Sequence, residues 1–212
     1  MSCLGGVSPD LNYQAFLADI LSKHDLKSVV DVYHFVRQMP YGGAGVRDPR
    51  AVYAKRSGTC SGKHILLRDL LNSLGCKADV LQVFLYFNRG IPVHATMPTE
   101  LQNIILNQDV SDFHNIVQLN VDDCAQPLLL DATWSDAMKP YGFTVNDNWS
   151  GMGDTQLAGN IIRTEEISAD VVDQKEKLLS GLSEDELALR GRFLNLLISW
   201  ISASISASTS GR

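Results

Sequence analysis

The sequence lacks the features that several protein classes require. Its four cysteines, Cys3, Cys60, Cys76 and Cys124, form no C-x-x-C pair, which argues against a zinc knuckle or a dithiol redox motif. No run reaches the roughly 18 apolar residues that a membrane helix needs, and the best candidate, residues 193–201, is far shorter. No Lys/Arg cluster is present, and 18 basic residues face 24 acidic ones. We therefore expect neither nucleic acid nor a membrane as a partner.

Signals for export and for metal binding are also missing. The first ten residues hold no basic stretch followed by an apolar run, so a cytoplasmic location is the default expectation. In a reducing compartment most of the cysteines should be free thiols. His24, His34 and His94 have no second ligand at a recognisable spacing. We expect no metal site and no cofactor.

What is present is the composition of an ordinary folded protein. Of the 212 residues, 45% are apolar and 20% are charged, which predicts one globular domain with terminal additions. The spacing of apolar residues predicts helices over 11–23, 27–38, 60–74, 101–106, 168–179 and 183–201. Runs rich in Val, Leu, Phe and Tyr predict strands over 79–87, 114–121 and 128–131. The last two should form an antiparallel pair through a turn at Asp122 and Asp123.

Cys60 differs from the other cysteines because of its surroundings. It opens a predicted leucine-rich helix within the segment Gly-Thr-Cys-Ser-Gly-Lys-His at 58–64. A helix N-terminus favours an anion, so the reactive thiolate is stabilised there. His114 begins one predicted strand and Asp131 ends the next, which would place an imidazole beside a carboxylate. These are the base and the orienting group that a thiol nucleophile needs. His64, by contrast, is expected to pack or to make supporting hydrogen bonds.

Three ordered segments resemble the transglutaminase-like superfamily within the papain-like cysteine enzymes. They are 58–64, then Asp-Phe-His-Asn at 112–115, then Leu-Asp-Ala-Thr-Trp at 130–134. Residues 35–52 also resemble bacterial members, so the likeness covers about residues 29–155. It implies an α+β fold, with a papain/transglutaminase-like core in which the nucleophile starts a central helix packed on an antiparallel sheet.

The chain divides into parts, and the resemblance implies a role for each site residue. The core should span about residues 27–155. The apolar spacing and the composition beyond it predict a helical extension over about 165–202 and a frayed tail over 203–212. Cys60 corresponds to the nucleophile, His114 to the general base and later acid, and Asp131 to the residue that orients the imidazole.

Two aromatic residues and one further aspartate have weaker assignments. Tyr41 lies where an upstream aromatic of the superfamily helps to form the oxyanion hole. Trp134 resembles an aromatic that follows the family's aspartate, so it is a candidate for substrate binding, with core packing as the alternative. Asp136 is the next candidate if Asp131 is not the orienting residue. The connection over 88–112 is expected to cover the cleft.

The implied function is cysteine-dependent acyl transfer on a peptide, protein or small amide substrate. Hydrolysis by a protease-like or amidase-like enzyme is favoured over transamidation by analogy with bacterial members. One alternative is a non-catalytic module that uses the same cleft to bind a peptide. A second is an α/β-hydrolase with a cysteine in its nucleophile elbow. The chain order argues against this second alternative, because His114 precedes Asp131.

Overall fold

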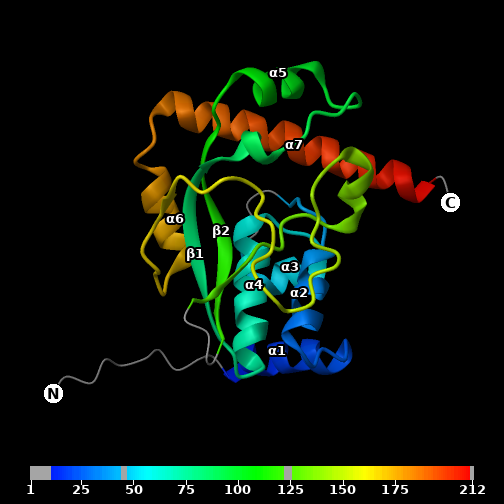
Figure 1. Ribbon diagram of the computed structural model, residues 1–212, viewed down its shortest axis with the longest axis vertical. Coiled ribbons are helices and arrows are strands. Elements are labelled where there is room, and N and C mark those ends of the chain that lie inside the picture. Colours follow the sequence, from blue (N-terminus) through cyan, green and yellow to red (C-terminus); the bar gives the residue numbers. More distant parts are fainter. Residues whose placement is uncertain (1–10, 44–46, 122–125, 211–212) are drawn as a thin grey trace.

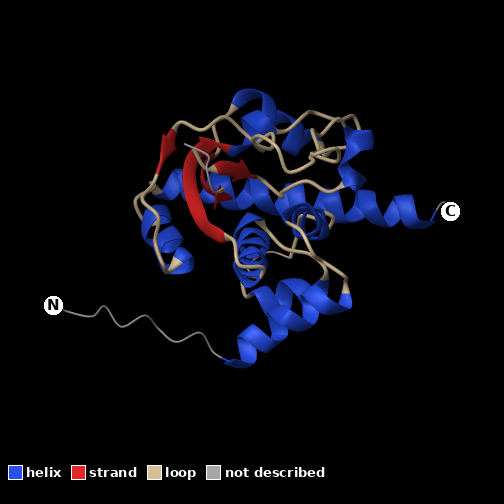
Figure 2. Ribbon diagram, turned by 60° about the horizontal axis from the view of Figure 1, so that its bottom comes forward, coloured by secondary structure: helices blue, strands red, loops and turns tan. Residues whose placement is uncertain are grey.

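The protein has an α+β architecture in which one central helix packs against a small antiparallel sheet (Figure 1). The computed structural model describes residues 11–43, 47–121 and 126–210. Cys3, Cys124 and the turn expected at Asp122 and Asp123 lie outside these ranges. The four strands are ordered β3-β2-β1-β4, and helices surround them (Figure 2).

Seven α-helices and four strands make up the described part of the chain. The α-helices are α1 (Leu11–Lys23), α2 (Val29–Arg37), α3 (Pro49–Lys55), α4 (Cys60–Ser73), α5 (Thr99–Asn107), α6 (Val171–Leu179) and α7 (Glu184–Ser210). The strands are β1 (Lys77–Tyr86), β2 (Ser111–Asn120), β3 (Leu128–Leu130) and β4 (Arg163–Thr164). Two 3₁₀ turns, η1 (Phe87–Gly90) and η2 (Asp136–Tyr141), lie between them.

Helix α4 is buried along most of its length. Leu66, Leu67, Leu70 and Leu71 are fully buried, and each such side chain contributes roughly 1.5–3 kcal/mol by leaving water. The helix contacts β1 and β2, and also α1, α2 and α3, so it lies between the sheet and the N-terminal helices. It ends before Gly75, whose positive φ of 87° suits a residue without a Cβ. This rigid setting fixes the position of the first residue of α4.

The long antiparallel pair of β1 and β2 positions His114. Val83 lies opposite His114, and Val117 lies opposite Leu130 of β3. Strand β2 therefore begins at Ser111, three residues before the start that the sequence predicts, because its first residues are buried and pair with the end of β1. His114 lies within the strand instead of at its beginning.

The C-terminal helix extends further than the sequence predicts. Residues 203–212 were expected to form a frayed tail, but α7 continues to Ser210. Ser204 is buried and its carbonyl accepts a hydrogen bond from the Tyr141 hydroxyl at 3.3 Å, while Ile205 packs on the core. These two contacts continue the buried stripe that contains Ile201. Within the described ranges, no helix combines the length and the apolar character needed to cross a membrane.

One helix before the site was not predicted. Helix α3 starts at Pro49 after Asp48, whose carboxylate accepts a hydrogen bond from the Arg50 N–H. An aspartate followed by proline is a recognisable helix start, so the signal was present. Strand β4 is only two residues long and carries no periodic pattern that could announce it.

Candidate active site

Cys60 is the first residue of α4, and its backbone is held by the segment before it. Tyr41 and Gly58 form an isolated parallel bridge, and the Gly58 N–H donates to the Pro40 carbonyl at 3.2 Å. The side chain of Thr59, the N-cap residue, makes no capping hydrogen bond. The N–H groups of the first turn of a helix have no partner within the helix. They are therefore available to an anion next to the sulfur.

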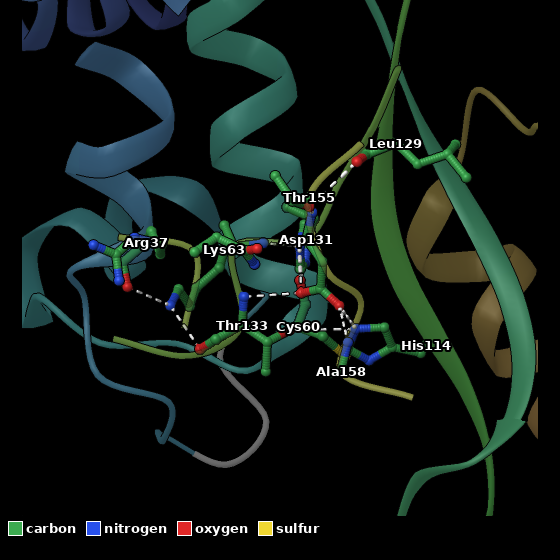
Figure 3. Close-up of polar contacts among 12 residues, drawn as sticks. Arg37, Cys60, Lys63, His114, Leu129, Asp131, Thr133, Thr155 and Ala158 are labelled. Atoms are coloured by element: carbon green, nitrogen blue, oxygen red, sulfur yellow. Dashed lines mark hydrogen bonds and ion pairs between the residues drawn. The ribbon is translucent and has the colours of Figure 1, made fainter. Parts of the chain in front are cut away.

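His114 and Asp131 form a buried pair, as their spacing predicts. The Nε2 atom of His114 lies 3.1 Å from Oδ2 of Asp131, and both side chains are almost completely buried. The Nδ1 atom of the ring has no hydrogen-bond partner of normal geometry in the described part of the chain. Figure 3 shows the imidazole next to the Asp131 carboxylate and to Cys60. One ring nitrogen is thus held by Asp131, and the other is free to exchange a proton.

The Asp131 carboxylate is fixed on every side. It accepts hydrogen bonds from the N–H groups of Thr133 at 2.9 Å and Ala158 at 2.8 Å. The backbone N–H of Asp131 donates to Oγ1 of Thr155 at 2.7 Å (Figure 3), and its backbone carbonyl accepts from the Tyr33 hydroxyl at 2.9 Å. Two hydrogen bonds besides that of His114 therefore orient the carboxylate, two more hold the Asp131 backbone, and the imidazole has little freedom to turn.

His64 links the nucleophile segment to the Asp131 loop. Its Nδ1 lies 2.7 Å from the Cys60 carbonyl, and the Ala132 N–H donates to its Nε2 at 2.9 Å. Because that N–H can only donate, Nε2 must accept, so the ring proton sits on Nδ1 and is donated to the carbonyl. His64 thus makes supporting hydrogen bonds, as expected, and its contact with Cys60 is to the backbone.

The charges around Cys60 favour its thiolate. Burial alone would raise the pKa of the thiol, but Lys175 and His114 outweigh burial and lower the pKa of Cys60 from 9.0 to about 5. Burial would likewise lower the pKa of His114, but Asp131 and Cys60 raise it from 6.5 to about 10. The pKa of Asp131 is held well below 3.8, because His114 and hydrogen bonds outweigh the effect of burial. Near neutral pH the pair is therefore a thiolate beside an imidazolium.

This charge pattern predicts an unusual pH dependence for the alkylation of Cys60. Below the pKa of about 5 the thiol is protonated and unreactive, and above it the thiolate fraction is constant. The iodoacetamide rate constant at Cys60 should therefore change little between about pH 6 and pH 8, where an ordinary thiol gains roughly tenfold per unit. Peptide mapping after timed labelling measures it. Cys76, whose pKa burial raises, is the internal control, and a parallel rise at both residues would contradict the thiolate assignment.

Two cations at the sulfur come from the C-terminal helices and were not predicted. The Lys175 ammonium of α6 lies 3.5 Å from Sγ of Cys60 and 4.0 Å from Oδ1 of Asp112. The Arg190 Nε of α7 donates to the same Asp112 oxygen at 2.7 Å. Burial would raise the pKa of Asp112, but these two cations lower it. A single lysine among the charged residues of a helix gives no signal in the sequence that it will face inward.

A cavity of about 270 Å³ opens beside the sulfur. Tyr41 lies in its wall with Cys60 and Ser61, and α6 and α7 supply Lys175 and Arg190. Cys60 itself is 2% exposed, so the cavity is the approach to the sulfur that the described residues leave. The segment over 88–112, expected to cover the cleft, does not line this cavity.

The two aromatic candidates are separated by the fold. Tyr41 lines the cavity beside Cys60, and burial, with a smaller effect from Cys60, raises the pKa of its hydroxyl well above 10. Trp134 packs against Tyr41 with ring centroids 5.2 Å apart and stacks on Phe87 at 6.0 Å. It lines a different cavity. The structure thus brings Tyr41, and not Trp134, to the nucleophile.

Asp136, the reserve candidate for the orienting residue, lies elsewhere. Its carboxylate pairs with Arg37 at 2.9 Å and is 40% exposed.

No cluster of three His, Cys, Asp or Glu side chains that could hold a metal ion occurs in residues 11–43, 47–121 and 126–210.

Lys63 is a buried cation that holds together the backbone segments around the site. Its ammonium donates to the carbonyls of Arg37 at 3.2 Å, Met39 at 2.6 Å and Thr133 at 3.0 Å (Figure 3). Burial lowers its pKa to about 7, but three carbonyl acceptors match the three donors of an ammonium group. Lys63 thereby ties α4 to the segment after α2 and to the loop that follows Asp131.

Replacing Lys63 by Met should destabilise the protein strongly. The thioether fills similar space but leaves three buried carbonyl oxygens without donors, which predicts a loss of about 3–5 kcal/mol in the free energy of unfolding. Urea denaturation followed by circular dichroism measures this loss. The matched control is Lys55→Met at an exposed position, which should stay within about 0.5 kcal/mol of the parent. Equal stability of the two variants would contradict the role of Lys63.

Comparison with known proteins adds little to this geometry. No protein-family model and no curated protein matches the sequence. Among solved structures, the chain is similar to a proposed cysteine protease from Cytophaga hutchinsonii, with 15% sequence identity and a TM-score of 0.40. The match covers 57% of this chain and 37% of that protein. A likeness this weak carries no argument, so the interpretation of the site rests on its own residues.

Proposed function

We propose that the protein is a cysteine-dependent acyl-transfer enzyme of the transglutaminase-like kind, acting on an amide or peptide through a thioester on Cys60. The observation that carries the proposal is the arrangement of a thiol at the start of a buried helix and an imidazole held by a buried carboxylate. The lowered pKa of Cys60 and the raised pKa of His114 match the needs of a nucleophile and a general acid.

The first half of the reaction forms the thioester. The Cys60 thiolate attacks the carbonyl carbon, and the resulting oxyanion is stabilised by the free N–H groups at the start of α4, with the Tyr41 hydroxyl as a further candidate donor. When the carbon–nitrogen bond breaks, the leaving nitrogen takes the proton from the His114 imidazolium. The products are a free amine, a neutral imidazole and the acyl group bound to sulfur.

The second half of the reaction releases the acyl group. His114 takes a proton from the incoming nucleophile, which attacks the thioester carbonyl, and the carbon–sulfur bond then breaks to restore the thiolate. Water gives a carboxylic acid, and an amine gives a new amide. We place hydrolysis first because the bacterial members that the motifs resemble are protease-like. Asp131 keeps the ring in place throughout and remains ionised.

Intact-protein mass spectrometry with activated acyl donors tests the proposal. We expect one acyl group per chain, which peptide mapping should locate at Cys60, and which should be lost as hydrolysis proceeds. If a broad panel of donors leaves no adduct, the mechanism is wrong. The alternative of a non-catalytic peptide-binding module predicts in addition that iodoacetamide labels Cys60 no faster than Cys76 at neutral pH.

A further inference from the structure

The wall of the cavity beside Cys60 carries more positive than negative charge. Lys175 and Arg190 both line it, and they share one carboxylate, that of Asp112. Arg47 also lines the cavity, but its guanidinium pairs with Glu176 at 2.7 Å, so this pair is locally neutral. The negative partner that completes the balance at the cavity is the Cys60 thiolate, 3.5 Å from the Lys175 ammonium.

Acylation removes that negative partner. Once the sulfur carries an acyl group it is neutral. Among the described residues, Lys175 then keeps the Asp112 oxygen at 4.0 Å as its anionic partner, and Arg190 already pairs with that oxygen at 2.7 Å. His114 loses a proton in the same step, which leaves the Asp131 carboxylate without its cationic partner. This negative charge does not compensate Lys175, because Asp131 does not line the cavity. A buried ammonium without a close anion is costly. The cavity side of the acyl-enzyme therefore lacks one negative charge.

We infer that the acyl group transferred to Cys60 carries a carboxylate of its own, which binds between Lys175 and Arg190. This inference rests on the proposed acyl transfer and names its substrate class: amides of a short diacid, or of an amino acid whose free carboxylate stays on the acyl side. The carboxylate takes over the position of the lost thiolate charge. Arg190 suits this role because it donates to Asp112 through its Nε, and its planar guanidinium has further donors.

The size of the cavity agrees with a short acyl group. Its volume of about 270 Å³ lies just below the range of typical ligand sites, which run from roughly 300 to 1,000 Å³. Leu194 and Ile198 of α7 form an apolar part of the wall, which suits a few methylene groups between the reacting carbonyl and the carboxylate. The wall of the cavity thereby limits the length of the acyl group, and the two cations favour a negative charge at its far end.

Paired alkylating reagents test the charge preference without requiring any turnover. Iodoacetate and iodoacetamide are nearly equal in size and differ in charge, and only iodoacetate leaves a carboxylate beside the sulfur. The ratio of their rate constants at Cys60, divided by the same ratio at Cys76, should be about ten or more. Arg190→Gln should lower this quotient toward one, and Arg190→Lys should retain most of it. A quotient of one or less in the unmodified protein overturns the inference, and this comparison does not depend on any variant folding.

Matched amide donors test the same preference in the proposed reaction. Glutaryl p-nitroanilide should show a kcat/KM about 10- to 100-fold above that of its methyl ester, in which the distal carboxylate is masked. Equal values, with both donors acylating Cys60, would overturn the inference and leave the acyl transfer standing. A clear iodoacetate preference without acylation by either donor would support the anion site and overturn the acyl transfer.

Discussion

Replacing Cys60 by Ala should abolish turnover and leave the fold in place. The substitution removes the sulfur on which the thioester forms, and the loss of a nucleophile of this kind costs about 10⁶-fold in kcat. The fold should persist because α4 is held by its leucines and by Lys63, whose contacts do not involve the sulfur. Release of p-nitroaniline from a reactive donor measures the rate, and circular dichroism with a thermal scan measures the fold.

The matched control is Cys76→Ala, which removes a free thiol outside the site and should keep the parental rate. A Cys60→Ala protein that is folded and retains a substantial part of the rate would mean that the chemistry takes place elsewhere. If Cys60→Ala does not fold, the same measurement is made on Cys60→Ser, which retains the shape of the side chain and a polar partner for Lys175.

Replacing Asp131 by Asn should lower kcat/KM by about 10⁴-fold, as in the serine protease triad where this exchange has been measured. The carboxylate accepts from three donors, the His114 ring and the N–H groups of Thr133 and Ala158. An amide presents one NH₂ group to a place where only acceptors fit, so the ring loses its partner or turns to the wrong tautomer. The pKa of His114 should fall with the loss of Asp131, which raises it.

The pH profile separates this role from a merely structural one. In the parent, activity should rise through the pKa of about 5 of Cys60 and fall only near the value of about 10 of His114, because the ion pair exists between them as one coupled unit. In Asp131→Asn the upper limb should move to lower pH. Asp136→Asn is the control, since that carboxylate is 40% exposed and pairs with Arg37, not with His114, and the variant should keep both the rate and the profile.

The parts of the site that the sequence predicts are those encoded in short segments. Cys60 begins its helix because a glycine-bounded start precedes a run of leucines, and His114 and Asp131 meet because two neighbouring strands are antiparallel. Each of these relations depends on residues close together in the sequence or on one strand pairing.

The cations of the site are of a different kind, and they escaped prediction. Lys175 reaches Cys60 across 115 positions of sequence, and Arg190 reaches Asp112 across 78. Lys63 lies within a recognised segment, yet its three carbonyl partners are backbone atoms with no side-chain signature. The contacts of Lys175 and Arg190 follow from how α6 and α7 dock onto the core, and those of Lys63 follow from the path of the backbone around α4. Periodicity and motif spacing specify neither.

The origin of Lys175 in α6 has a consequence for the timing of reactivity during synthesis. Ribosomes build the chain from its N-terminus, so the sulfur, the imidazole and the carboxylate emerge well before α6. Until that helix docks, the thiol lacks the cation that does most to lower its pKa. The contact between Lys175 and the sulfur would therefore exist only once α6 has been made and has docked.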